Sequence, residues 1–412
     1  MSRQRARAVA RRRAKIKDRD QDRATRRTRL ERILGLMGIG GWGRHLDAGT
    51  LDHLCREFNP KPRVVTDAGH SRDRNLEGRA KTLQQELDRV AIRIGPDDLS
   101  FNDYHSVVMS LLLLFRTGAA DRTLGEFMRE PAAATEEFAR QHNDAIWKAY
   151  RSKVLSRLGE AGSIDTAIYS GRREFVPVGN RIGLTLILRR TPVPSRTIVA
   201  DGVGRRAYLC GDFSDLESGD VDWVEWDARA LGLGGSQRLP VYIQSHALHQ
   251  IRHRLAIKPD HLVDYTLWQS LDEPVLTPLS GNAYLVEYRI LQHKLGYLVA
   301  EVLGDVVLVR TFLLVTMQGT PEGSEFSRRL RLRRPDIEYL ELDHLGTLIA
   351  TDLARDPEIA GLLRECGCGG ALDFAPNIQV TAILEGYAAR FRGHMGLALS
   401  DISSRYLVEP GG

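Results

Sequence analysis

The spacing of apolar residues along this 412-residue chain changes near Gly162, and that change limits the folds the sequence can adopt. Before Gly162, apolar residues recur at helical spacing over 81–92, 100–115 and 132–158. After it, short runs of β-forming residues are separated by Gly, Pro or Asp, which is typical of strands. These runs are 164–169, 174–178, 182–188, 196–200, 206–210, 221–226 and 239–244. The pattern predicts an α+β protein with a helical N-terminal unit, an antiparallel β-rich centre that contains one His/Arg helix, and a helical C-terminal segment.

Composition and periodicity together predict four segments. They are a basic arm at 1–32, a helical domain at 33–160, a β-rich domain at 161–325 and a helical C-terminal segment at 326–412. A chain of this length has room for two or three domains. Hydrophobic residues make up 42% and charged residues 27%, which is typical of a globular protein with a core. Within the helical domain, 33–42 is expected to form a glycine-rich turn and 69–79 a polar loop.

The sequence lacks the features expected of a membrane, a secreted or a disulfide-rich protein. The longest apolar run, 107–115, is shorter than the ~20 residues that a membrane helix needs. The N-terminal arginines are not followed by an apolar stretch, so no secretory signal is expected. Four cysteines in this length do not suggest a disulfide scaffold, and Cys366 and Cys368 are expected in an exposed loop. A cytoplasmic, bacterial protein without a membrane partner follows.

The positive charge is concentrated at the N-terminus. Residues 1–32 hold twelve Arg and two Lys against three Asp and one Glu, a net charge of +10, which leaves −5 for the rest of the +5 chain. Such arms bind polyanions, because each phosphate contact releases a counterion. Arg11, Arg12, Arg13 and Lys15 are therefore candidate nucleic-acid contacts in a frayed helix that orders on its partner. The alternative is a solvated tail with no specific partner.

A second basic cluster lies at 328–334. Arg328, Arg329 and Arg331 are candidate nucleic-acid contacts, alternating with leucines in a segment predicted as an edge strand or a helical turn. The alternative is a solvated face without a ligand.

The strongest local motif is the histidine- and arginine-rich segment 245–257, which reads as a helix between a Ser245 N-cap and a stop at Pro259. At ~100° per residue, Leu248, Ile251 and Leu255 share one face. On the opposite face lie His246, Gln250 and His253, with His249 beside that polar face and Arg252 and Arg254 on its two flanks. We expect this helix to bury its apolar face against a sheet and to turn its histidines outward.

A second helix at 260–270 and three strands at 283–290, 295–303 and 306–315 are expected next. The last two strands are joined at Gly304-Asp305, a two-residue hairpin signal. The strands are therefore predicted to form a three-stranded antiparallel meander.

Taken together, Ser-His-Ala-x-x-x-Ile-Arg-x-Arg-Leu at 245–255, the second helix and the meander resemble the BrnT-like branch of the RelE/ParE toxin superfamily. The resemblance covers about 239–318, here called the cassette, and rests on His246, Ala247, Arg252 and Arg254. The sequence departs from the pattern because such toxins are usually small stand-alone proteins. His249 and His253 are also additional, and Lys294, Arg310 and Thr311 match only by position.

The resemblance implies RNA cleavage without a metal ion or other cofactor. The 2′-hydroxyl attacks the adjacent phosphate, so the site needs a base, an acid and cations for the extra phosphate charge. Under this hypothesis His246 is the base or acid and His253 is the reserve acid/base, because histidine titrates near neutral pH. Arg252 and Arg254 would be the phosphate clamps. Candidate partners are RNA or the ribosome and a neutralising protein.

Three other interpretations stay open. The polar helix face could be solvated or bind a partner without chemistry. His246, His249 and His253 could supply two ligands to a metal ion, although a carboxylate would have to come from elsewhere. The chain could also be a non-catalytic nucleic-acid-binding or assembly protein, including one from a mobile element.

Overall fold

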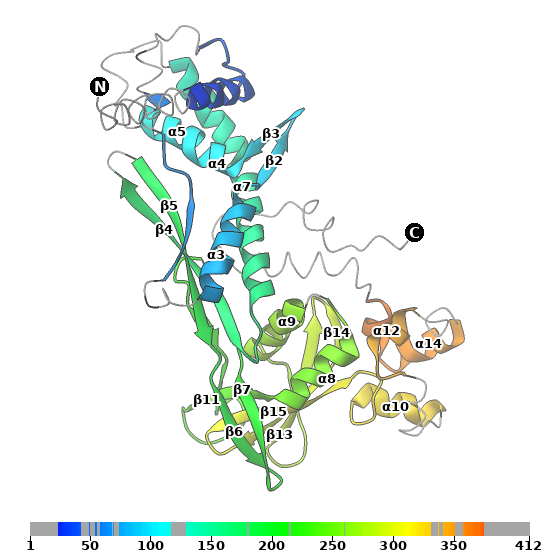
Figure 1. Cartoon of the computed structure of the whole chain (residues 1–412). Coiled ribbons are helices and arrows are strands. Elements are labelled where there is room, and N and C mark those ends of the chain that lie inside the picture. Colours follow the sequence, from blue (N-terminus) through cyan, green and yellow to red (C-terminus); the bar gives the residue numbers. More distant parts are fainter. Residues whose placement is uncertain are drawn as a thin grey trace, which may run out of the picture. The chain divides into compact units, whose positions relative to one another are not determined.

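The computed structural model describes residues 24–42, 49, 54–55, 58–67, 69, 74–116, 129–178, 181–213, 216–258, 260–330, 337, 341–350 and 357–374. The chain divides into two compact units (Figure 1). Among the described residues, the first unit contains those up to Val154 together with 173–187, and the second contains 155–172 and those from 188 onward. Three long elements contribute to both units: α7 (Arg129–Ala161), β4 (Ala167–Val178) and β5 (Arg181–Pro192). The chain therefore passes between the units more than once, whereas a single change near residue 160 was predicted.

The first unit is mostly helical, as predicted. Its helices are a segment at 24–36, α3 (Arg74–Leu87), α4 (Phe101–Asp103), the π-helical turn η3 (Tyr104–Val108), α5 (Met109–Arg116) and most of α7. Three short strands were not predicted: β1 (Arg63–Thr66), β2 (Ala91–Ile94) and β3 (Asp97–Ser100). The hairpin between β2 and β3 turns at Gly95-Pro96, where Gly95 adopts a φ of 58° that glycine tolerates.

One local prediction in this unit was wrong and another was only partly right. The segment 69–79 was expected to be a loop, but α3 begins at Arg74 and buries Leu76 along with Leu83 and Leu87. The segment 33–42 was expected to be a turn, and residues 37–42 do form turns, but residues 24–36 are helical and bury Leu30, Ile33 and Leu34. This helix crosses the boundary that the charge pattern placed at residue 32, because its apolar positions continue on both sides of it.

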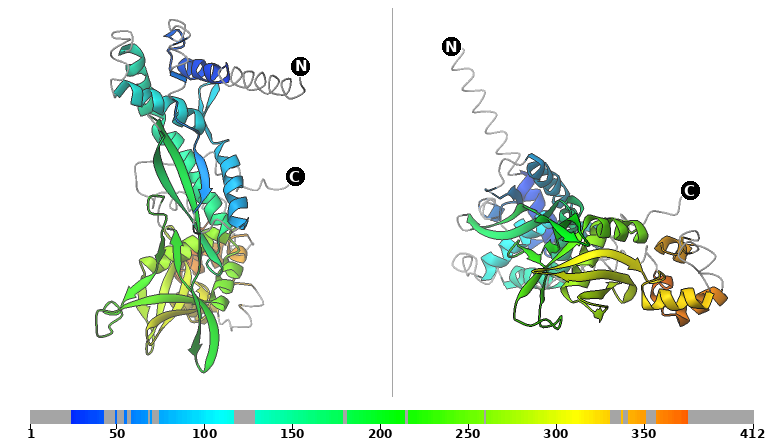
Figure 2. Two further views of the ribbon diagram at one scale, coloured as in Figure 1. Left: turned by 60° about the vertical axis from the view of Figure 1, so that its left-hand side comes forward. Right: turned by 90° about the horizontal axis from the view of Figure 1, so that it is seen from below.

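The second unit is built on an eight-stranded sheet. Its strands lie in the order β12-β13-β14-β15-β11-β7-β6, with β10 paired to β11, and can be followed in green and yellow in Figure 2. They are β6 (Ser195–Ala200), β7 (Val203–Leu209), β10 (Glu225–Asp227), β11 (Arg238–Gln244), β12 (Leu276–Pro278), β13 (Ala283–Ile290), β14 (His293–Leu303) and β15 (Val306–Leu314). A separate pair joins β8 (Gly211–Phe213) to β9 (Val221–Trp223). The α+β class and the meander β13–β14–β15 are confirmed, including the turn at Gly304-Asp305.

The centre of the sheet is a parallel pair that the sequence did not predict. β11 runs parallel to β15, with Val241 opposite Val307 and Ile243 opposite Val309. All four side chains are buried. Between these two strands the chain passes through two helices and the strands β12, β13 and β14: α8 (Ser245–Leu255) packs on β11 and β15, and α9 (Asp260–Asp272) packs on β13. The cassette thus forms the sheet from its β12 edge to β11, and β7 and β6 extend the sheet beyond β11.

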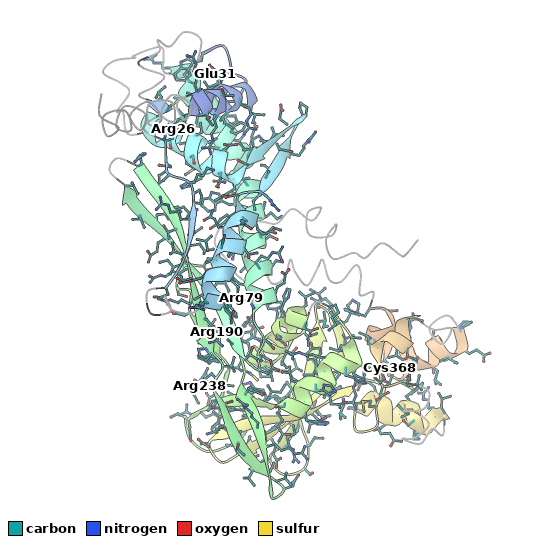
Figure 3. The ribbon with its side chains drawn as sticks, in the orientation of Figure 1. Arg26, Glu31, Arg79, Arg190, Arg238 and Cys368 are labelled. Carbon is teal, nitrogen blue, oxygen red and sulfur yellow. The ribbon has the colours of Figure 1, made fainter. Side chains whose placement is uncertain are left out.

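The C-terminal segment is helical in its described part, as predicted. It contains α10 (Pro321–Leu330), α12 (Leu345–Ala350), α14 (Pro357–Glu365) and α15 (Gly369–Leu372). The segment 366–368 is a turn, as expected, but the expected exposure was wrong, because the side chains of Cys366 and Cys368 are both buried. Cys368 is labelled in Figure 3. Burial raises the pKa of Cys368 to about 12, which keeps this thiol protonated at neutral pH.

Across the described residues, none of the helices has the length and apolar character needed to cross a membrane.

Candidate functional site

The helix α8 presents its histidines as the sequence predicted. Leu248, Ile251 and Leu255 are buried against the sheet, whereas His246, His249 and His253 are exposed. The predicted N-cap is displaced by one residue: Gln244 holds that position and Ser245 is the first helical residue. The helix ends at Ala256, whose left-handed backbone (φ 50°) lets its amide donate to the Arg252 carbonyl.

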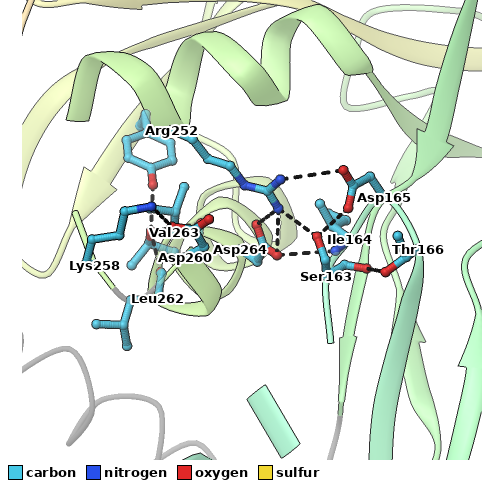
Figure 4. A network of polar contacts seen from close by, with 12 residues as sticks. Ser163, Ile164, Asp165, Thr166, Arg252, Lys258, Asp260, Leu262, Val263 and Asp264 are labelled. Carbon is cyan, nitrogen blue, oxygen red and sulfur yellow. Dashed lines mark hydrogen bonds and ion pairs between the residues drawn. The ribbon is translucent and has the colours of Figure 1, made fainter. Parts of the chain in front are cut away.

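Arg252 is held inside a network of polar contacts (Figure 4). Its Nη2 donates to Asp264 Oδ1 and Oδ2 at 2.8 and 3.0 Å, and to Ser163 Oγ at 2.8 Å. Its Nη1 lies 3.6 Å from Asp165 Oδ2. Asp264 also accepts from the backbone amide of Ile164 at 3.2 Å. The guanidinium thus fixes α8 to α9 and to the segment 163–165, which favours a structural role over the predicted phosphate clamp.

The charges of this network depend on each other. Burial acts to lower the pKa of Arg252, but Asp264, Asp165 and Asp260 outweigh it and the pKa is raised. Burial raises the pKa of Asp264, an effect that Arg252 opposes. Removing the guanidinium would therefore leave a carboxyl group that favours its protonated form.

Arg254, the second predicted phosphate clamp, is also largely enclosed. Its side chain is 13% exposed, and its guanidinium donates to the carbonyl oxygen of Phe312 at the end of β15. Its Nε lies 3.8 Å from Asp343 Oδ2. Arg254 therefore places Asp343 beside the C-terminal turn of α8.

The C-terminal half of α8 meets a histidine that sequence reasoning missed. Nδ1 of His253 lies 3.1 Å from Nε2 of His344, and Nδ1 of His344 lies 3.0 Å from Asp343 Oδ1. Asp343 is buried, His344 is partly buried and His253 is exposed. We call these three residues the His–His–Asp cluster. His249 adjoins it, with its ring stacked at 5.8 Å from that of His253.

Hydrogen-bonding rules assign the protons in this cluster. An ionised Asp343 only accepts, so Nδ1 of His344 must carry the hydrogen between them. In a neutral His344 ring, Nε2 then accepts, and Nδ1 of His253 must donate to it. The unprotonated nitrogen of His253 is consequently Nε2. The arrangement converts the exposed His253 into an oriented base backed by a second imidazole and a buried carboxylate.

A hollow of about 350 Å³ adjoins the His–His–Asp cluster. Its lining residues come from the end of α8 and from the segment around His344, and we call it the Glu341 hollow. They are Arg254, Ala256, Glu341, His344, Gly346 and Thr347.

His246 lies apart from the His–His–Asp cluster. It precedes His253 by seven positions on α8, a rise of about 10 Å along the helix axis. The structure therefore brings His253 together with His344, not with His246.

Of the seven predicted nucleic-acid contacts, two lie among the residues that the structure describes. Arg328 and Arg329 lie on α10, and both donate to Glu325; Arg329 also pairs with Glu365 at 2.7 Å. These pairings favour the solvated-face interpretation. Arg331, together with Arg11, Arg12, Arg13 and Lys15 of the arm, lies outside the described residues, so these contacts stay predictions.

The polar residues Lys294 on β14 and Arg310 on β15 also form ion pairs. Lys294 contacts Glu322 at 2.5 Å, and Arg310 contacts Glu301 at 2.7 Å and Asp201. Among the residues that the structure describes, no group of three or more His, Cys, Asp or Glu is arranged to hold a metal ion. The basic and acidic groups of this region are thus mainly engaged with each other, and His253 is the exposed member of the His–His–Asp cluster.

Known proteins give no family for this arrangement. Comparison of the chain with protein-family models, with curated proteins and with solved structures returned no match.

Proposed function

We propose that this chain is a cytoplasmic RNA-binding protein whose cassette, completed by His344 and Asp343, cleaves RNA without a metal ion. The His–His–Asp cluster is the observation that carries the proposal. The order of elements in the cassette adds support. The BrnT-like resemblance implies a strand, two helices and then an antiparallel meander, and the cassette contains these elements in that order.

The proposed reaction needs two proton transfers. The 2′-oxygen attacks the adjacent phosphorus and its proton passes to Nε2 of His253. The bond from phosphorus to the 5′-oxygen then breaks, and the leaving oxygen takes a proton from an acid. Exposed His249, whose ring lies 5.8 Å from that of His253, is the candidate for this acid. The products are a 2′,3′-cyclic phosphate and a 5′-hydroxyl.

His344 and Asp343 would act through His253. When His253 gains the proton, its Nδ1 hydrogen bond to His344 strengthens, and Asp343 offsets the new positive charge through the His344 ring. This division of roles differs from the one suggested by the sequence, which placed His246 first. His253 becomes the base, and His344 and Asp343 are positioning residues.

The first test compares RNA cleavage by the wild-type chain with that of single variants in EDTA. His253→Ala is expected to reduce the cleavage rate at least about 100-fold, because it removes the general base. His344→Ala is expected to reduce the rate less and to shift its pH dependence, whereas His344→Gln should restore part of the rate. Gln250→Ala, on the same helix, is the control and should cleave like wild type.

Two results would contradict the assignment in different ways. If His246→Ala abolishes cleavage and His253→Ala does not, the cassette is catalytic but the His–His–Asp cluster is not its site. If no variant and no wild-type protein cleaves RNA, while salt-dependent RNA binding is lost on deletion of residues 1–23, the chain is the non-catalytic binder. The deletion stops before residue 24 because the helix at 24–36 buries Leu30 and Ile33.

A further inference from the structure

We infer that the Glu341 hollow is a guanine-binding subsite in which the Glu341 carboxylate recognises the Watson–Crick edge of the base. The inference rests on the proposed function and adds a substrate preference to it, namely RNA with guanine beside the cleaved bond.

The hollow has a suitable size and place. Its volume of about 350 Å³ falls within the range of sites that hold small ligands. His344 is one of its lining residues and is also the middle member of the His–His–Asp cluster. A base held in the hollow would therefore bring its own ribose and phosphate close to the two imidazoles.

Glu341 is the chemically distinctive residue of the hollow. Its side chain is exposed, and no hydrogen bond or ion pair joins it to any other described residue. The nearby cation, Arg254, is already engaged by Asp343 and by the Phe312 carbonyl. The hollow thus offers an uncommitted carboxylate that can accept two hydrogen bonds from a ligand.

The backbone around the hollow is held in an uncommon conformation. Glu341 is left-handed, with a φ of 52°, which residues other than glycine seldom adopt. The turn at Glu341 is fixed on both sides: the Leu342 amide donates to Ile337, and the His344 amide donates to the Glu341 carbonyl at 3.1 Å. Thr316 also donates to the Leu342 carbonyl. Such conformations concentrate at ligand sites, where the surrounding structure maintains them.

The chemistry of a carboxylate selects among the four bases. Guanine presents two adjacent donors, N1–H and N2–H, which match the two oxygens of a carboxylate in a bidentate pair. Adenine and cytosine each place a ring-nitrogen acceptor beside their amino group, and that acceptor repels the carboxylate. Uracil has one N–H between two carbonyl acceptors. A carboxylate therefore favours guanine over the other three bases.

The test measures binding of guanosine 3′-monophosphate and adenosine 3′-monophosphate to the full chain by calorimetry. Wild type is expected to prefer the guanine nucleotide. Glu341→Gln should weaken guanine binding about 10- to 100-fold and leave adenine binding unchanged, because the amide turns one acceptor into a donor that meets the N–H groups of guanine. Glu273→Gln, a second exposed glutamate located after α9, is the matched control and should bind both nucleotides like wild type.

Mapping of RNA cleavage sites separates this inference from the proposed function. Cleavage next to guanine by wild type, with the preference lost but cleavage retained in Glu341→Gln, would support both. Cleavage without base preference, together with equal binding of the two nucleotides, would overturn the subsite and leave the proposed function standing. Guanine binding that depends on Glu341 without any RNA cleavage would overturn the proposed function and keep the subsite. The subsite would also be overturned if the Glu341→Gln variant bound both nucleotides as tightly as wild type does.

Discussion

Replacing Arg252 with methionine is expected to lower the free energy of unfolding of the second unit by about 3 kcal/mol. The methionine fills much of the same space but leaves Asp264 without its cation, and the side chain of Asp264 is only 15% exposed. The Asp264 side chain would keep the Ile164 amide as a donor but would have to stay charged without a counter-charge or take up a proton. For this reason, breaking one side of an enclosed ion pair costs more than the pair itself contributes. Ser163 would lose its Arg252 donor as well.

Urea unfolding followed by circular dichroism measures this effect. The double variant Arg252→Met/Asp264→Leu should recover most of the lost stability, because it replaces the whole pair with apolar groups. Arg238→Met is the matched control: Arg238, labelled in Figure 3, pairs with Glu225 at 3.6 Å, and the two side chains are 62% and 45% exposed. A surface pair of that kind contributes less than about 1 kcal/mol.

The same variant decides between two roles for Arg252. If the arginine clamps phosphate, as the resemblance implied, Arg252→Met would weaken RNA binding and leave the unfolding midpoint unchanged. If it fixes α8 to α9, the midpoint falls and RNA binding per folded molecule is retained. The geometry of four contacts to Asp264, Ser163 and Asp165 predicts the second result.

The sequence predicted the elements that depend on local spacing. The apolar face of α8 and the exposure of His246 and His253 followed from the helical period. The turn at Gly304-Asp305 followed from glycine's freedom to adopt a positive φ, which it does here at 61°. These features are encoded within a few residues, so a single sequence suffices to find them.

The sequence could not predict features that join distant segments. The parallel pairing of β11 with β15 links residues more than sixty positions apart, and no periodicity marks a strand's partner. His344 is a lone histidine in an acidic segment, and only the fold brings it within 3.1 Å of His253. Arg252 looked like a free phosphate ligand because its partners, Asp264 and Asp165, carry no signal that they face it.

The second large effect is expected from pH and comes from His261 on α9. Its side chain is 92% buried, and neither ring nitrogen finds a hydrogen-bond partner among the described residues. The ring packs directly against Gly159 and lines a cavity of about 30 Å³ together with Ser163, Asp212 and Asp264. Burial lowers the pKa of His261 to about 4, although Glu160 and Asp260 act to raise it.

A histidine whose pKa is lower in the folded protein destabilises it under acid. Between about pH 6.5 and pH 4 the unfolded chain binds a proton at His261 that the folded chain does not bind, so the free energy of unfolding falls as the pH falls. The difference between the ordinary pKa of 6.5 and the value of about 4 in the folded protein corresponds to about 3 kcal/mol over this interval, and above pH 6.5 His261 adds no pH dependence. His261→Gln removes the titration, so its stability should fall by about 3 kcal/mol less than that of wild type between pH 7 and pH 4. Urea midpoints at both pH values measure the difference, and carboxyl groups that titrate in both proteins cancel in the comparison.

Parallel pH profiles for the two proteins would show that His261 finds a partner for its proton when the cavity becomes acidic. In that case Asp264 and Asp212, which line the same cavity, would be the carboxylates to replace next, since either could pair with a charged imidazole.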